Sequence, residues 1–277
     1  MSCVDSVPSL SPTVTKIIQV ANNPNASADE LIQVIKLDPV LTGKVIKMIN
    51  SVYYGMQQKV VSLGRAVILL GINTIKNLAL STAIVGNFKR KGRIGQFDMN
   101  AFWEHCLGCA VGSKLLAKSK NIDKLLWEEY FIAGLLHDIG KLALAQFAPE
   151  EYAEVFEVLQ REPEKGEVAV EELILGTNHA RIGGLIAEKW KLPEVLVNSI
   201  LEHHGPAVSE QGFCIKTAVY IANIHCHRKK FADSSSNSQE YDPRILKAVG
   251  LTEEKLEDIL TPLENDIQLA RSFLEMS

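Results

Sequence analysis

The sequence predicts an all-α protein. Apolar residues recur with helical spacing along most of the 277 residues. Ser, Thr, Asp or Asn precedes many of these segments, and Gly or Pro follows several, as is typical of helix starts and ends. No alternating run of β-branched residues is long enough to predict a strand. An apolar content of 47% supplies enough side chains for a large core.

The first 95 residues contain four predicted helices. Each begins at a side chain that can accept a hydrogen bond from the free backbone N–H groups of a first helical turn. These starts are Ser27, Asp38, Ser62 and Asn73. The string from Lys89 to Gly95 lacks an apolar face, so we expect a linker that ends an N-terminal helical subdomain of residues 1–95.

Residues 96–277 are expected to form a second helical domain. Within it, Phe131 to Ala145 is apolar on every face except at His137, Asp138 and Lys141. This pattern predicts one continuous buried helix with a His-Asp pair in its middle. Because a buried carboxylate costs several kcal/mol unless it is paired or binds a metal, this pair requires a partner.

Further histidines are predicted to point toward the same core. Each shares a helix face with large apolar side chains; they are His105, His179, His203 and His204. One inward histidine is usually a satisfied core residue, but several from separate helices have a simpler common cause. They predict a divalent-metal centre, for which the donor set leaves Fe, Mn, Zn and Ni open.

Four motifs carry these residues. In chain order they are Trp103-Glu-His105, Gly134-Leu-Leu-His-Asp-Ile-Gly-Lys141, Asn178-His-Ala-Arg-Ile-Gly183 and His203-His204-Gly-Pro206. Together they resemble the HD superfamily, and more narrowly its HDOD branch, the HD-related output domain of bacterial signalling proteins. The resemblance covers roughly residues 7–230 and is specific as a set, whereas a lone His-Asp dipeptide is not.

The resemblance implies a set of metal ligands. In HD phosphohydrolases the matching positions are His105, His137 and Asp138, together with a late aspartate that is Asn223 in this chain. In HD-GYP phosphodiesterases further histidines build a second metal position, and these match His179, His203 and His204. The Gly-Tyr-Pro signature of those enzymes is missing.

Two departures bear on activity. Asn223 can ligate only through a neutral carbonyl oxygen, so it removes one negative charge and cannot act as a base. Lys141 matches a phosphate-contacting lysine of HD-GYP enzymes, although it can equally form an i,i+3 pair with Asp138.

The resemblance and these departures together favour a signal-transduction interaction module with a partly degenerate HD metal site, whose partners are signalling proteins. The alternative is a metal-dependent phosphohydrolase acting on a nucleotide or cyclic dinucleotide, with Asp138 and Lys141 as catalytic residues. Phosphodiester hydrolysis in the presence of added metal distinguishes the two.

Charge and composition argue against other partners. Residues 1–95 hold 11 basic and 4 acidic residues, and residues 96–277 hold 18 and 29. We expect solvated faces or attraction between the halves rather than nucleic acid, because the helix after Gly71 is an apolar core helix without base-reading side chains. Lys76 interrupts the one long apolar stretch, which argues against a membrane span. Scattered cysteines and a start without a basic, apolar leader predict reduced thiols in the cytoplasm.

Two cysteines and two histidines outside the predicted metal site are expected to have structural roles only. Cys106 and Cys109 have the spacing of a redox pair but are expected to be small core residues. His225 and His227 precede a basic run, so we expect them to be exposed at a helix end.

Overall fold

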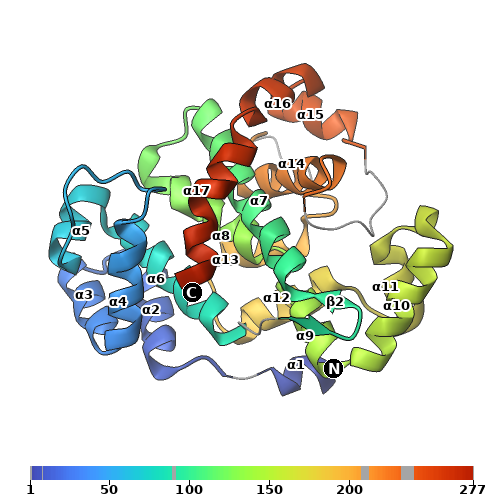
Figure 1. Cartoon of the computed structure of the whole chain (residues 1–277), viewed down its shortest axis with the longest axis horizontal. Coiled ribbons are helices and arrows are strands. Elements are labelled where there is room, and N and C mark those ends of the chain that lie inside the picture. The colour runs from blue at the N-terminus through green and yellow to red at the C-terminus, as the bar shows by residue number, and fades with distance from the viewer. Residues whose placement is uncertain (1, 8, 89–91, 207–211, 232–239, 277) are drawn as a thin grey trace.

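The computed structural model describes residues 2–7, 9–88, 92–206, 212–231 and 240–276. Within these ranges, helices form every element except one short hairpin, which confirms the all-α prediction (Figure 1). In the same ranges no single helix has the length and apolar character needed to cross a membrane; one bent pair, Lys124–Phe147 with Pro149–Arg161, meets those two criteria jointly.

Three of the four predicted helix starts in this part, Ser27, Asp38 and Ser62, are N-caps. The predicted start at Asn73 is wrong, because the helix already begins at Ile72, and Asn73 Oδ1 accepts from Lys76 Nζ at 3.3 Å instead. The N-terminal helices follow in chain order. They are α1 (Ser2–Ser6), α2 (Pro12–Asn22), α3 (Ala28–Lys36), α4 (Pro39–Ile49), α5 (Leu63–Leu70) and α6 (Ile72–Phe88). The predicted capping box is present, because Ser27 Oγ accepts the backbone N–H of Glu30 at 3.1 Å and Glu30 accepts that of Ser27 at 2.8 Å. Helices α2 to α5 all pack against α6, so the apolar faces of this part meet in one layer.

Part of the predicted linker folds as a hairpin. Residues 89–91 lie outside the described residues. After them, β1 (Arg93–Ile94) pairs antiparallel with β2 (Phe97–Asp98). Two-residue strands leave no alternating pattern, which is why the sequence analysis missed them. A domain boundary near residue 95 stays a prediction.

The remaining helices form the rest of the molecule, and α7 is the longest of them. The α-helices are α7 (Met99–Ser119), α8 (Trp127–Leu136), α9 (Ile139–Phe147), α10 (Pro149–Arg161), α11 (Glu167–Leu175), α12 (His179–Lys189), α13 (Glu194–Leu201), α14 (Ile215–Arg228), α15 (Pro243–Val249), α16 (Glu253–Leu260) and α17 (Leu263–Met276). A 3-10 turn, η1 (Lys124–Leu126), lies between α7 and α8, and a second, η2 (Pro163–Lys165), lies between α10 and α11. Helix α7 packs against α8, α14, α16 and α17, and α17 also reaches α4 and α6.

The predicted continuous helix over Phe131–Ala145 is wrong. Helix α8 ends at Leu136 and α9 begins at Ile139, so His137 and Asp138 occupy the turn between them. The turn is closed by the backbone N–H of Lys141, which donates to the Asp138 carbonyl at 2.9 Å. Likewise, α13 ends at Leu201, so His203 and His204 lie in the following turn rather than on the predicted helix.

Candidate metal centre

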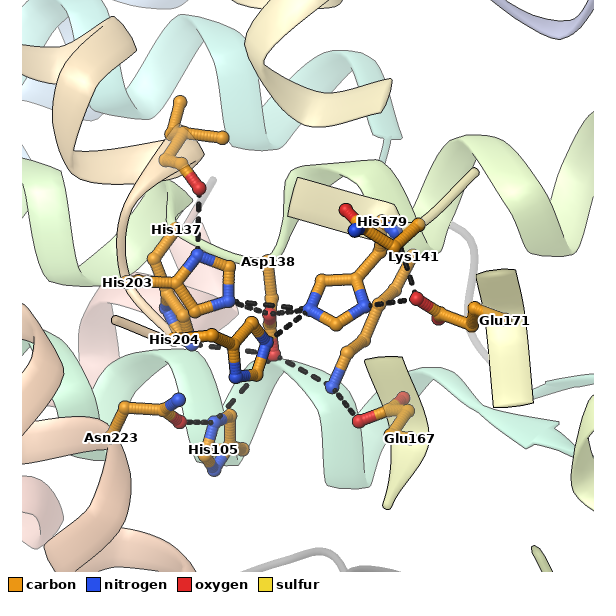
Figure 2. Close-up of polar contacts among 12 residues, drawn as sticks. His105, His137, Asp138, Lys141, Glu167, Glu171, His179, His203, His204 and Asn223 are labelled. Carbon is orange, nitrogen blue, oxygen red and sulfur yellow. Dashed lines mark hydrogen bonds and ion pairs between the residues drawn. The ribbon is translucent and has the colours of Figure 1, made fainter. Parts of the chain in front are cut away.

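All seven predicted metal-site residues meet around Asp138, in the interior of the molecule (Figure 2). They come from α7, the α8–α9 turn, the start of α12, the turn after α13, and α14. All are buried except His204, which is partly exposed. The convergence expected from helical phase is therefore present, although two of the expected helices end earlier than predicted.

Both carboxylate oxygens of Asp138 face imidazole nitrogens. Oδ1 lies 3.1 Å from His203 Nε2 and 3.3 Å from His179 Nε2. Oδ2 lies 3.3 Å from His137 Nε2 and 3.0 Å from Lys141 Nζ. Burial opposes ionisation of this carboxyl, yet the neighbouring His137 and Lys141 hold the pKa of Asp138 well below its usual range.

The ring orientation of His203 leaves a lone pair directed at Asp138. Its Nδ1 lies 2.7 Å from the Ile200 carbonyl oxygen, which can only accept, so Nδ1 carries a proton. Burial lowers the pKa of His203 to about 4, so the ring is neutral near pH 7. Its Nε2 therefore presents a lone pair to a carboxylate oxygen 3.1 Å away. Two such groups repel unless a cation lies between them.

His137 has the same arrangement. Its Nδ1 lies 2.7 Å from the carbonyl oxygen of Gly134. Its Nε2 and Asp138 Oδ1 are buried and have no hydrogen-bond partner among the described residues. Buried polar atoms without a partner indicate a site where a bound ion would satisfy them.

The spacing of the donors fits a divalent ion. One donor atom each from Asp138, His179, His203 and His204 lies within 4.8 Å of the others. His179 Nε2 is 3.2 Å from His203 Nε2 and 2.7 Å from His204 Nε2. Metal–ligand bonds of about 2.0–2.2 Å place neighbouring ligands roughly 3.0–3.5 Å apart. Imidazole and carboxylate together suit Fe, Mn, Zn and Ni.

Two glutamates of α11 join the cluster, and the sequence analysis missed both. Glu171 Oε2 accepts from His179 Nδ1 at 2.6 Å and from the His179 backbone N–H at 2.8 Å. Burial would lower the pKa of His179, but the Glu171 and Asp138 carboxylates together raise it to about 10. Glu167 Oε2 accepts from Lys141 Nζ at 2.8 Å. The i,i+4 spacing of the two glutamates around buried Val170 was the available signal.

The His105 side of the cluster is built differently. Asn223 faces the site, and its Oδ1 accepts from His105 Nε2 at 3.0 Å. That bond places the proton of His105 on Nε2, which is 3.7 Å from Asp138 Oδ2. Cys109 Sγ lies 3.5 Å from the same nitrogen. Cys106 and Cys109 are buried core residues as predicted, and Cys109 also borders the cluster.

The predicted exposure of His225 and His227 is wrong. They are only 3% and 4% exposed, because α14 is enclosed on nearly every face. The His227 ring lies 4.5 Å from that of His105. His227 follows Asn223 by one helical turn, so the two residues share a face of α14, and this spacing could have predicted that His227 lies beside the cluster. His225 Nδ1 lies 3.0 Å from the Tyr241 hydroxyl, away from the cluster residues.

A cleft of about 290 Å³ opens onto this side of the cluster. Its floor includes His105, Asp138 and Lys141, and its wall includes Phe97 of β2 and Tyr152 of α10. Lys141 forms the i,i+3 pair with Asp138 that the sequence allowed, and it simultaneously binds Glu167. Its charge is therefore already balanced by two carboxylates.

A helical fold with a His-Asp pair in a turn between two helices, surrounded by histidines from neighbouring elements, defines an HD-type protein. The HDOD domain family model matches residues 7–206. The chain belongs to the HDOD family.

Two solved structures and one curated protein are similar to this chain. An HDOD domain protein of unknown function from Geobacter sulfurreducens is 26% identical with a TM-score of 0.79, over 100% of this chain and 95% of that one. A candidate phosphohydrolase from Shewanella amazonensis is 25% identical with a TM-score of 0.76, over 98% and 96%. An uncharacterised Treponema pallidum protein is 26% identical over 225 residues; the match covers 80% of this chain and 42% of that relative's length.

Proposed function

We propose that this HDOD protein holds a divalent metal ion at Asp138, His179, His203 and His204, and that it serves as a signal-transduction interaction module. The observation that carries the metal site is geometric: His203 Nδ1 lies 2.7 Å from the Ile200 carbonyl oxygen, which directs Nε2 toward Asp138 Oδ1 at 3.1 Å, beside the imidazoles of His179 and His204. His179, backed by the Glu171 carboxylate, has the second partner that metal-binding histidines commonly have.

The His105 side supports an interaction role over hydrolysis. Asn223 replaces the acidic ligand of the family pattern and engages His105 Nε2. A second ion on this side would therefore meet one charge fewer and a histidine whose proton occupies the donor position. We infer one well-built position and one degenerate position, with the metal serving mainly to order the core.

The free thiols of Cys106, Cys109, Cys214 and Cys226 fit a cytoplasmic location.

Elemental analysis tests the metal site. We expect the protein, purified after growth with Fe, Mn, Zn and Ni, to carry about one equivalent of metal per chain. Asp138→Ala should lose it, because the carboxylate between the imidazoles is removed. His225→Ala is the matched control, a buried histidine bonded to Tyr241 rather than to the cluster. Equal metal content in Asp138→Ala and the parent protein would refute the site.

Metal removal gives a second readout. An ion that binds only the folded chain stabilises it by mass action. We therefore expect a chelator to lower the unfolding temperature of the parent protein but not that of Asp138→Ala. An equal drop in the unfolding temperature of both proteins would mean that the chelator does not act by removing a metal from this site.

A phosphohydrolase is the alternative, and the cleft that reaches Asp138 and Lys141 favours it. A bound divalent ion supplies an activated water and polarises phosphoryl oxygens. In this chain Lys141 would orient a phosphate at the cleft floor, and Glu167 would hold Lys141 in place. Hydrolysis of a panel of nucleotides and cyclic dinucleotides, abolished by Asp138→Ala, would favour the enzyme; no turnover with metal bound favours the module.

A further inference from the structure

The outer face of α5 carries large apolar side chains in contact with solvent. Ile68 is 77% exposed and Leu69 47%, whereas Leu63 and Ala66 on the inner face are buried. A helix that is apolar on all sides is normally enclosed on all sides. In Figure 1, α5 lies at the edge of the molecule, so its outer face is available to another molecule.

The turn η1 extends this surface. Leu125 is 50% exposed and Leu126 is 38% exposed. A Cβ built on Gly71 would lie 3.1 Å from Leu125 Cδ2, which places Leu125 at the C-terminal end of α5. We call the combined surface the docking face; it consists of Ile68, Leu69, Leu125 and Leu126. Contiguous exposed apolar side chains of this kind mark interaction sites.

Three cations without a salt bridge in the described part of the chain lie beside the docking face, and the exposed Asp123 next to it is used as the N-cap of η1. Lys59 and Arg65 border α5, and Lys124 begins η1; none of them forms a salt bridge with any described residue. Residues 36–76 contain six Lys or Arg and one acidic residue, Asp38. Asp38 is already used as the N-cap of α4. An occupant with acidic groups around an apolar centre would therefore complement this surface.

We propose that the docking face binds an amphipathic helix of a partner protein, with apolar residues at helical spacing and Asp or Glu beside them. Ile68 and Leu69 at the end of α5, with Leu125 and Leu126 of η1 beside them, offer the apolar contacts that a partner's amphipathic helix uses when it docks. An anionic membrane is the poorer occupant. Membrane-surface helices carry several basic residues along one polar face, whereas the three cations here come from separate segments and α5, only eight residues long, supplies Arg65 alone.

This proposal rests on the proposed interaction role, but it uses none of the metal-cluster residues. Its failure and that of the metal site are therefore separable. Metal content reports on the cluster, and peptide binding reports on the docking face.

Peptide binding to the metal-loaded full chain tests the proposal. The probes are a fluorescent acidic amphipathic peptide and a twin in which each Glu is Lys, measured by anisotropy at low and high salt. We expect the acidic peptide to bind, more weakly at high salt, and the basic twin not to bind. Ile68→Asp should weaken binding about tenfold or more, because it places a charge in the apolar centre of the interface.

Leu173→Asp is the matched control, since Leu173 of α11 is 70% exposed and lies outside the docking face. It should bind like the parent, and thermal melts should show all variants folded. Equal binding by Ile68→Asp, no binding of the acidic peptide, or binding of the basic twin would overturn the proposal. Stronger association with phosphatidylglycerol vesicles than with the acidic peptide, lost in Ile68→Asp, would replace the protein partner with a membrane.

Discussion

Single residues decide what the buried cluster can bind. Asp138 gives one carboxylate oxygen to His179 and His203 and the other to His137 and Lys141. The second partners of the rings determine where their protons lie. Backbone carbonyls fix His137 and His203, while a carboxylate fixes His179.

Glu171 should tune metal affinity without touching the ion. We expect Glu171→Gln to weaken metal binding about 10- to 100-fold, because His179 loses the negative charge that orients it and strengthens it as a donor. Competition with a chromophoric chelator measures the affinity. Glu164→Gln, at an exposed glutamate of η2, should leave the affinity unchanged. Equal affinities for the two variants would mean that Glu171 only fills space.

Asn223→Asp should repair the His105 side. The new carboxylate would stand where Asn223 Oδ1 now accepts from His105 Nε2, and it would add the missing negative charge. We expect more metal retained per chain after dialysis than in the parent protein. Asn100→Asp makes the same change at an exposed position of α7 and should have no effect. Unchanged retention in Asn223→Asp would contradict the idea of a degenerate position.

The sequence allowed part of this site to be predicted. Imidazoles on apolar helix faces identified the five histidines and Asp138, because no other explanation placed so many polar rings in one core. Glu167 and Glu171 were missed because glutamates on an amphipathic helix are usually solvated. His227 was missed because the basic run after it suggested a helix end in solvent.

At the scale of elements, helix starts depend on residues nearby in the sequence, whereas some helix ends depend on packing against distant helices. Helix starts such as Ser27 and Asp38 were predicted because a cap acts within three residues. The turn at His137-Asp138 could not be predicted, because it depends on α12. A Cβ on Gly140 of α9 would lie 1.9 Å from the His179 carbonyl oxygen, so the two helices meet backbone to backbone.

This close approach makes Gly140 a test of how helix packing positions the cluster. We expect Gly140→Ala to lower the free energy of unfolding by about 1–3 kcal/mol or more and to reduce metal binding, since α12 and His179 must move. Urea denaturation and metal content measure the two effects. Gly43→Ala in α4, where a Cβ meets nothing within 4 Å, should be neutral or stabilising by about 0.5–1 kcal/mol. Similar behaviour of both variants would argue against the backbone contact.

At the scale of the whole molecule, a buried ion pair links the N-terminal helices to the helices of the metal centre. Lys114 of α7 pairs with Glu128 of α8, and both are less than 10% exposed. The turn after α4 reaches this pair, because the Tyr54 hydroxyl donates to Glu128 Oε2 at 3.2 Å and the Tyr53 ring lies 4.6 Å from Lys114 Nζ. Burial would lower the pKa of Lys114, but Glu128 raises it above its ordinary value.

Removing one partner should therefore destabilise the molecule strongly. We expect Glu128→Gln to cost about 3–5 kcal/mol of unfolding free energy in urea denaturation, because it leaves a buried ammonium group without its counter-charge. The double variant Lys114→Met/Glu128→Leu should recover much of that loss, since no charge remains buried. Metal content should persist in the double variant, because neither residue belongs to the cluster. A double variant as unstable as Glu128→Gln would show that the geometry of the pair, and not its unpaired charge, holds the tyrosine turn against α7 and α8.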